Sequence, residues 1–169
     1  VQTHLVGAYN VLNMLAALSV GLFLGVSAEE ANRALSNYVP SNNRSQLEET
    51  AHNKLIMDAY NANPTSMSVA LNNFHDMEVP HKMAILGDML ELGAVSQSAH
   101  QAIVNQLSQL ALDEVWLVGP EFARTSCAFR KFNDVEEVIA ELKKHRPENH
   151  YILVKGSNGI HLDKLPQWL

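Results

Sequence analysis

From about residue 44 onward, short apolar runs alternate with segments whose apolar residues recur at helical spacing. Four continuous apolar runs predict buried strands, at residues 54–57, 82–87, 115–118 and 151–154. Helices are expected at residues 64–77, at 98–110 and from Asp134 onward. Strands that alternate with helices predict an α/β fold, with a three-layer, mostly parallel Rossmann-like sheet and flanking helices. A hairpin of residues 45–50 and 54–59 should open the sheet.

The apolar positions of each predicted helix indicate which face turns toward the sheet. For residues 64–77 they are Met67, Ala70, Leu71, Phe74 and Met77. For residues 98–110 they are Ala99, Ala102, Ile103, Leu107 and Leu110. For the helix that follows Asp134 they are Val135, Val138, Ile139 and Leu142.

The first 38 residues have a different pattern. Residues 10–24 are apolar nearly all the way round a helix, so this helix needs partners on several sides. Ser27 and Glu30 have capping-box spacing and predict a second helix that ends near Asn37. Loop-forming residues at 40–44 indicate a domain boundary. We therefore expect residues 1–38 to be the helical tail of a truncated central domain and residues 39–169 to be a separate domain, within a longer protein.

Composition excludes some classes of function. The 169 residues are 47% hydrophobic, as in globular proteins, and carry a net charge of -6 without a basic stripe, which argues against nucleic-acid binding. The apolar stretch 11–26 is shorter than the ~20 residues of a membrane span and is interrupted by polar residues and glycine, so no membrane insertion is expected. The single cysteine, Cys127, suits a reducing cytoplasm.

Residues 58–67, with the sequence D-A-Y-N-A-N-P-T-S-M, join a predicted strand to a predicted helix. Asp58 falls at the carboxyl end of the strand, next to a helix N-terminus, which is where open α/β sheets bind ligands. Asn63 is a good N-cap and Pro64 fits the first helical position. Tyr60 and Asn61 could line the cleft together with these residues. The alternative is structural, with Asp58 as a turn former and Asn63 only as a cap.

Two further candidates precede this motif. Asn10 and Asn13 lie three residues apart on one face of a helix, and a pair of amides offers the donor and acceptor that reading an adenine edge requires. They could instead be a helix cap and a polar filler. Arg44 has a planar fork that suits phosphate or carboxylate, although a solvated loop arginine explains it equally well.

Two loops after strands complete the candidate set. The sequence G-D-M-L-E-L-G places Asp88 and Glu91 after a strand, and His100 follows. Lys155 and Ser157 come directly after the last strand, where a lysine could meet an anion or simply be exposed. Parallel strands would bring both loops to the edge that carries Asp58.

Several familiar motifs are absent from the sequence. It contains no G-x-x-x-x-G-K-[ST] phosphate loop, no G-x-G-x-x-G after the first strand and no G-x-S-x-G elbow. The histidines are scattered without ligand spacing, so no metal-binding residues are predicted in this chain.

Taken in order, G-A-Y-N-V-L-N, N-N-R, D-A-Y-N-A-N-P-T-S-M, G-D-M-L-E-L-G and V-K-G-S resemble the Mur ligases of bacterial cell-wall synthesis. The resemblance spans essentially the whole chain. It runs from the last helices of the family's central ATP-binding domain through its C-terminal domain. D-A-Y-N-A-N-P-T-S-M and G-D-M-L-E-L-G resemble most the motifs of the member that uses a dipeptide acceptor.

The resemblance implies a cytoplasmic, ATP-dependent ligase that joins D-alanyl-D-alanine to UDP-N-acetylmuramoyl-tripeptide through an acyl phosphate, with Mg²⁺ as metal. The phosphate loop, the metal ligands and the UDP-sugar domain would lie upstream of Val1, so this chain should be inactive alone. The implied catalytic residues are Arg44 and Asp58. The implied nucleotide-binding residues are Asn10, Asn13, Arg44, Asp58 and Tyr60. The implied substrate-binding residues are Asn61, Asn63, Asp88, Glu91, His100, Lys155 and Ser157.

Two other interpretations remain open on the pattern of residues alone. The α/β alternation also fits a non-catalytic Rossmann-type nucleotide-binding module. An interaction or folding domain whose polar loops are only turns is the second alternative.

Overall fold

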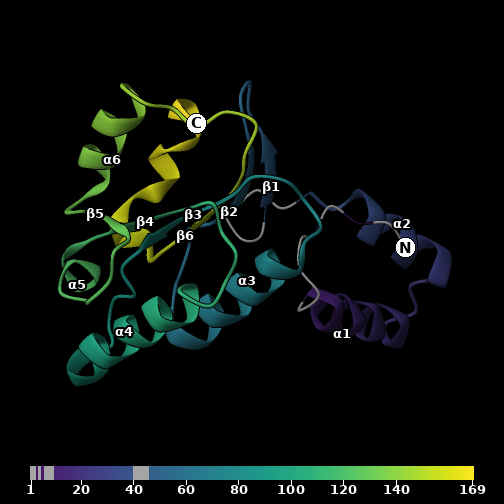
Figure 1. Ribbon diagram of the computed structural model, residues 1–169. Helices are drawn as coiled ribbons and strands as arrows, with labels where there is room; N and C mark the ends of the chain where they lie inside the picture. The colour runs from purple at the N-terminus through teal and green to yellow at the C-terminus, as the bar shows by residue number, and fades with distance from the viewer. Residues whose placement is uncertain (1–2, 4, 6–9, 40–45) are drawn as a thin grey trace.

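A single six-stranded sheet with helices on both faces forms the main body of the computed structural model (Figure 1). The structure describes residues 3, 5, 10–39 and 46–169. The strands are β1 (Gln46–Glu49), β2 (Lys54–Asp58), β3 (Lys82–Gly87), β4 (Glu114–Val118), β5 (Arg130–Phe132) and β6 (Tyr151–Lys155). The α-helices are α1 (Asn10–Phe23), α2 (Ala28–Asn37), α3 (Pro64–Asp76), α4 (Ser96–Leu107), α5 (Pro120–Ala123) and α6 (Val135–Leu142). Short 3-10 helices lie at Gly93–Val95, Asn158–Ile160, Leu162–Lys164 and Pro166–Trp168.

The strand order is β1-β2-β6-β3-β4-β5. The β1 strand pairs with β2 in antiparallel orientation, and the other neighbouring pairs are parallel. The predicted hairpin and the predicted mostly parallel α/β sheet are both confirmed. The last strand in the sequence, β6, lies between β2 and β3, and this position decides which loops meet.

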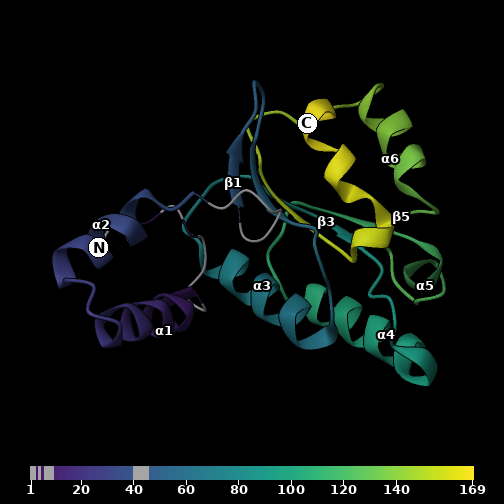
Figure 2. The same cartoon turned by 180° about the vertical axis from the view of Figure 1, so that it is seen from behind.

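Apolar side chains pack on both faces of the sheet, because alternate residues of a strand point to opposite sides. Leu55 and Met57 belong to the core that α6 and the C-terminal 3-10 helices cover. Ile56, between them, belongs to the core under α3 and α4. The two views in Figures 1 and 2 show these layers, with α3 and α4 on one side of the sheet and α6 on the other.

The α3 helix starts as the sequence predicts. Asn63 accepts a hydrogen bond from the Ser66 backbone N–H at 2.8 Å, and the Ser66 hydroxyl accepts one from the Asn63 N–H at 3.2 Å. Pro64 occupies the first turn, where a missing N–H leaves no bond unmade. Four of the five predicted apolar residues of this helix are buried, namely Met67, Ala70, Leu71 and Phe74.

The predicted buried stripe of α4 is partly wrong. Ala102 is exposed, whereas His100 and Val104 are buried with Ile103 and Leu107. The inward stripe is therefore rotated around the helix toward a histidine. The sequence pattern does not predict this rotation, because a polar side chain seldom faces a core. His100 does so because both of its ring nitrogens find hydrogen-bond partners.

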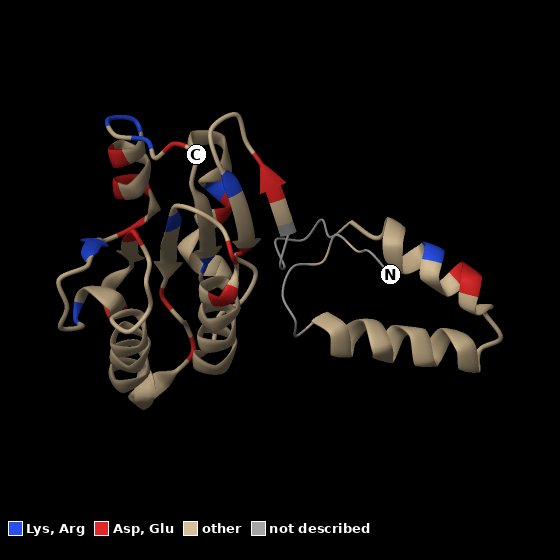
Figure 3. Ribbon diagram, turned by 45° about the vertical axis from the view of Figure 1, so that its right-hand side comes forward, with Lys and Arg blue, Asp and Glu red and all other residues tan. Residues whose placement is uncertain are grey.

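The α1 and α2 helices lie beside the main body and pack against each other (Figure 1). The capping box of α2 is confirmed, since Ser27 and Glu30 exchange the expected hydrogen bonds. The α1 helix carries no charged residue, as Figure 3 shows, yet Leu12 is 73% and Phe23 is 88% exposed. The described chain therefore does not bury this apolar helix. Among the described residues, no helix is long and apolar enough to span a membrane.

Residues 40–45, which include the predicted domain boundary and Arg44, are outside the described part of the chain. The boundary between residues 1–38 and 39–169 stays a prediction.

The sequence pattern also missed β5 and α5. Both are too short to show a periodicity. Two of the three residues of β5, Arg130 and Lys131, are basic, so β5 is not an apolar run.

Candidate functional site

Three polar loops meet at one edge of the sheet. They follow the carboxyl ends of β2, β6 and β3, which are adjacent in that order and parallel. Asp58 ends β2, Lys155 ends β6, and Asp88 comes directly after β3. The sequence prediction that these loops share an edge is confirmed, because the strand order makes them neighbours.

A cleft of about 740 Å³ opens at the carboxyl end of β2. Seven predicted site residues line it: Asn10, Asn13, Asp58, Tyr60, Asn61, Asn63 and Lys155. Four residues of the first turns of α3 complete the lining: Pro64, Thr65, Ser66 and Val69. The sequence interpretation missed Thr65, Ser66 and Val69 as lining residues, although their position just after the Asn63 cap could have indicated them.

Asp58 and Lys155 form a mostly buried ion pair at the floor of this cleft. They are direct neighbours in the β2–β6 register, and Lys155 Nζ donates to Asp58 Oδ2 at 2.6 Å. The exposed fraction is 2% for the Lys155 side chain and 17% for that of Asp58. Asp58 Oδ1 accepts no hydrogen bond from a described residue, so this oxygen is available to a ligand in the cleft.

Asn10 and Asn13 lie on the first turn of α1 and line the same cleft. Asn13 Nδ2 donates to Asn10 Oδ1 at 3.1 Å, which holds the two amides together on one face, as their spacing predicts. Asn10 is buried, while Asn13 is exposed. The side-chain oxygen of Asn13, Oδ1, has no partner among the described residues and can accept a hydrogen bond from a ligand.

The first turn of α3 forms part of the cleft wall, which Pro64, Thr65 and Ser66 line. The backbone N–H groups at a helix N-terminus carry partial positive charge, which favours an anionic group nearby. The cleft therefore combines amides, a carboxylate oxygen and a helix N-terminus. This set can hold a base, a sugar hydroxyl and an anion.

A second pocket of about 290 Å³ adjoins the first. Tyr60 and Asn61 line both cavities, so the turn after β2 lies between the two cavities and forms part of each wall. The other lining residues are Leu90, Glu91, Ser157, Asn158 and Gly159. The sequence interpretation missed Leu90, Asn158 and Gly159, although each is next to a predicted site residue or one position further on.

Among the described residues that line this second pocket, Glu91 is the one with an ionisable carboxylate. It is exposed and has a positive φ of 66°, a backbone conformation that is uncommon for a residue other than glycine. Such strained positions are frequent at binding sites. The exposed carboxylate suits a cationic group, such as an amine.

Asp88 is fully buried and its contacts are internal. One carboxylate oxygen accepts from the Glu121 N–H and the other from the Phe122 N–H, both at 2.8 Å, at the start of α5. Burial raises the pKa of Asp88 above the ordinary value of 3.8, and these two backbone hydrogen bonds oppose the rise. Asp88 thus fixes the β3 loop to α5.

His100 is also fully buried and holds the same loop. Its Nε2 accepts from the Met89 N–H at 3.0 Å, so Nδ1 carries the ring hydrogen and donates to the Ser96 carbonyl at 2.8 Å. Asp88 Oδ1 lies 3.7 Å from Nε2, but a ring that accepts at Nε2 is neutral there and forms no ion pair. The prediction that Asp88 and His100 contact substrate stays a prediction.

Ser157 joins the loops that follow β6 and β3. Its hydroxyl accepts from the Leu90 N–H at 2.9 Å, and its N–H donates to the Asp88 carbonyl at 3.1 Å. The structure therefore brings all the described candidate residues except Asp88 and His100 to one of the two cavities.

Among the described residues, no group of three or more His, Cys, Asp or Glu is arranged to hold a metal ion.

Residues 43–158 match the family described as "Mur ligase, glutamate ligase domain". The chain is also similar to UDP-N-acetylmuramoyl-tripeptide–D-alanyl-D-alanine ligases. It is 30% identical to the Bacillus subtilis enzyme over 172 residues, which is 95% of this chain and 38% of that enzyme. It is 30% identical to the Escherichia coli enzyme over 165 residues, which is 94% of this chain and 36% of that enzyme. The chain spans well under half the length of these relatives.

Solved structures are similar over nearly the whole chain. A crystal structure of MurF from Acinetobacter baumannii superposes with a TM-score of 0.80 at 30% identity, covering 94% of this chain and 37% of that one. A structure of MurF ligase from Thermotoga maritima in complex with ADP has a TM-score of 0.80 at 23% identity, covering 97% and 38%. The second likeness establishes a common fold.

Proposed function

The chain belongs to the Mur ligase family, and we propose from this premise that it is the C-terminal part of an ATP-dependent ligase. The proposed reaction joins D-alanyl-D-alanine to UDP-N-acetylmuramoyl-tripeptide in the synthesis of peptidoglycan precursors. Support comes from the relatives that carry this name and from the two adjoining cavities at the carboxyl edge of the sheet. The use of ATP and a UDP-linked precursor would make the reaction cytoplasmic.

ATP would supply the phosphoryl group that converts the terminal carboxylate of the tripeptide into an acyl phosphate, which the amine of D-alanyl-D-alanine attacks with release of inorganic phosphate. Positioning of the reacting groups and stabilisation of the charge on phosphate are the main requirements of phosphoryl transfer. Arg44 is assigned by its motif to the nucleotide phosphates, although it lies outside the described residues. Mg²⁺ is implied by the family resemblance, and the proposal assigns it to no residue of this chain.

The larger cleft has the groups that a nucleoside needs. The amides of Asn10 and Asn13 provide a donor and an acceptor for the adenine edge. Asp58 Oδ1 can accept hydrogen bonds from ribose hydroxyls, since Lys155 occupies Oδ2. The N-terminus of α3 favours the negative charge of the phosphates. The residues present therefore fit ATP, and Tyr60 and Asn63 belong to the same wall.

The smaller pocket is assigned to the acceptor dipeptide. Glu91 would attract the amine of D-alanyl-D-alanine, and the exposed apolar surface of Leu90 suits the methyl groups. Asn61 and Asn158 offer amide donors for the carboxylate. Because Tyr60 and Asn61 line both cavities, the acceptor would lie next to the nucleotide, as transfer through an acyl phosphate requires.

The single observation that carries the proposal is the meeting of Asn13, Asp58 and Tyr60 in one cleft that adjoins a second pocket. The test is phosphate release by the full-length protein with ATP, UDP-N-acetylmuramoyl-tripeptide and a panel of amine acceptors. Release should depend on D-alanyl-D-alanine and should fall sharply in Arg44→Ala and Asp58→Ala. Turnover that needs no dipeptide would overturn the function, and unchanged turnover in both variants would overturn the assignment of these two residues.

A second experiment separates the ligase from a nucleotide-binding module without catalysis. The isolated chain should release no phosphate, because the family's phosphate loop is absent from it. Tight, micromolar binding of ATP by the isolated chain in calorimetry, together with a full-length protein that does not turn over, would favour the binding module.

A further inference from the structure

We propose that Lys155 is a positioning residue, which fixes the turn between the two cavities and presents one Asp58 oxygen to the nucleotide. This inference rests on the proposed function, since it assigns Asp58 to the ribose. It replaces a role for Lys155 in binding a substrate anion, which its place after a strand predicted. The evidence is the set of contacts that the Lys155 ammonium makes.

The Lys155 ammonium contacts both ends of one short turn. Its Nζ donates to Asp58 Oδ2 at 2.6 Å and to the Asn61 carbonyl oxygen at 3.3 Å. Lys155 ends β6, which lies between β2 and β3, so the side chain reaches the turn from the neighbouring strand. The residues of this turn include Tyr60 and Asn61, which line both cavities.

Burial makes these contacts obligatory. The Lys155 side chain is 2% exposed, and a buried ammonium is costly unless charged or polar partners surround it. Both partners come from the same turn, so the position of the turn and the compensation of the buried charge depend on each other. Removal of the ammonium would leave the Asp58 carboxylate without its counter-charge and would free the turn at both ends.

The same geometry makes Lys155 a poor anion ligand. Its charge is already compensated by the Asp58 carboxylate, and its ammonium is almost inaccessible from the cleft. A phosphate would have to displace that carboxylate. The useful result of the pair is orientation: with Oδ2 bound to Lys155, Oδ1 is the oxygen that remains for a hydroxyl group of the ligand.

Nucleotide binding by the full-length protein tests this proposal. The dissociation constants of ATP and of 2′,3′-dideoxy-ATP, which lacks both ribose hydroxyls, would be measured by calorimetry without acceptor. We expect the wild-type protein to prefer ATP by about tenfold or more, as a charge-assisted hydrogen bond allows. Lys155→Met should reduce this preference at least fivefold. The double variant Lys155→Met, Asp58→Asn should show no further loss relative to Asp58→Asn.

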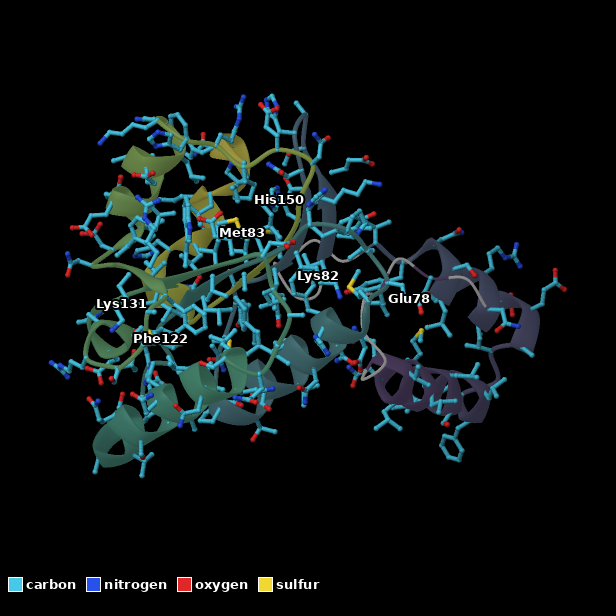
Figure 4. All side chains as sticks on the ribbon, viewed as in Figure 1. Glu78, Lys82, Met83, Phe122, Lys131 and His150 are labelled. Carbon is cyan, nitrogen blue, oxygen red and sulfur yellow. The ribbon has the colours of Figure 1, made fainter. Side chains whose placement is uncertain are left out.

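Lys131→Met is the matched control. Lys131 lies on β5, at the edge of the sheet opposite β1 (Figure 4), and its ammonium is held by the backbone carbonyls of Ala123 and Thr125. It lines neither cavity. Its replacement should leave the preference for ATP over the dideoxy nucleotide unchanged, even where stability falls.

An equal loss of affinity for both nucleotides in Lys155→Met would overturn the proposal, because it would indicate a general structural role. An undiminished preference for ATP would overturn it as well. Should Lys155→Met not fold, Lys155→Arg decides: its charge would preserve anion binding, whereas its longer planar fork should displace Asp58 and reduce the preference about threefold. Failure of the proposed function is recognised separately, as wild-type protein that binds ATP but releases no phosphate with D-alanyl-D-alanine.

Discussion

Asp88 and Gly119 lie so close that position 119 has no room for a side chain. A Cβ atom at Gly119 would collide with the Asp88 carboxylate, and the φ of Gly119 is +119°. This glycine precedes α5, whose first N–H groups donate to Asp88. The loop after β3, which carries Glu91, is therefore locked to α5 by a carboxylate that needs a glycine opposite it.

Gly119→Ala should destabilise the protein by about 2–4 kcal/mol, through backbone strain at a conformation that only glycine adopts readily and through displacement of the Asp88 carboxylate from the start of α5. The measurement is the urea midpoint of unfolding. Gly93→Ala is the control, since φ is +55° there and no atom lies within 4 Å of the added Cβ. It should cost about 1 kcal/mol. Equal losses in the two variants would contradict the collision.

The raised pKa of Asp88 gives a pH dependence of definite sign. The native state holds this proton more tightly than the unfolded state, so Asp88 contributes stability below the ordinary value of 3.8 that is lost as pH rises through the raised native value. The stability of wild type relative to Asp88→Asn should therefore fall as pH rises across that window and then level off. Urea unfolding at a series of pH values checks this. A difference that grows with pH would show that hydrogen bonding outweighs burial.

His100→Phe should destabilise the protein by about 1–3 kcal/mol, because the buried Met89 N–H would lose its acceptor. The displaced loop should also raise the KM for D-alanyl-D-alanine more than the KM for ATP. Unfolding and steady-state kinetics of the full-length protein measure the two effects. His145→Phe is the control, since its side chain is 78% exposed, and it should change stability by about 0.5 kcal/mol or less. Equal effects of both variants would argue against the His100 contact.

Under the proposed function, Asn13→Ala should weaken ATP binding about 3- to 10-fold and reduce the preference for ATP over GTP, since it would lose one hydrogen bond to the adenine edge. Calorimetry with both nucleotides measures this change. Asn72→Ala removes an exposed asparagine of α3 whose amide bonds to Gln106, outside the cleft. That control should bind both nucleotides as wild type does. A loss of affinity that is the same for ATP and GTP would place Asn13 away from the base.

The amino-acid sequence by itself determined strands β1 to β4 and β6, the main helices and the polar motifs. Local rules are sufficient for these features: Asn63 caps α3 because its side chain reaches the Ser66 N–H, and apolar periodicity places Met67 and Phe74 inward. Local rules were not sufficient for β5 and α5, which are too short to show a period. Nor could they indicate that His100 faces the core, since the Met89 N–H that it binds comes from another loop.

Only the tertiary structure decided which loops become neighbours. Strand order depends on long-range pairing, and it inserts β6, the last strand in the chain, between β2 and β3. That insertion places Lys155 next to Asp58, 97 positions earlier, and turns an apparent surface lysine into a buried partner. Lys155 can be buried there because the Asp58 carboxylate compensates the charge of its ammonium. A sequence pattern records that Lys155 follows a strand, but the packing of two strands determines what its ammonium contacts.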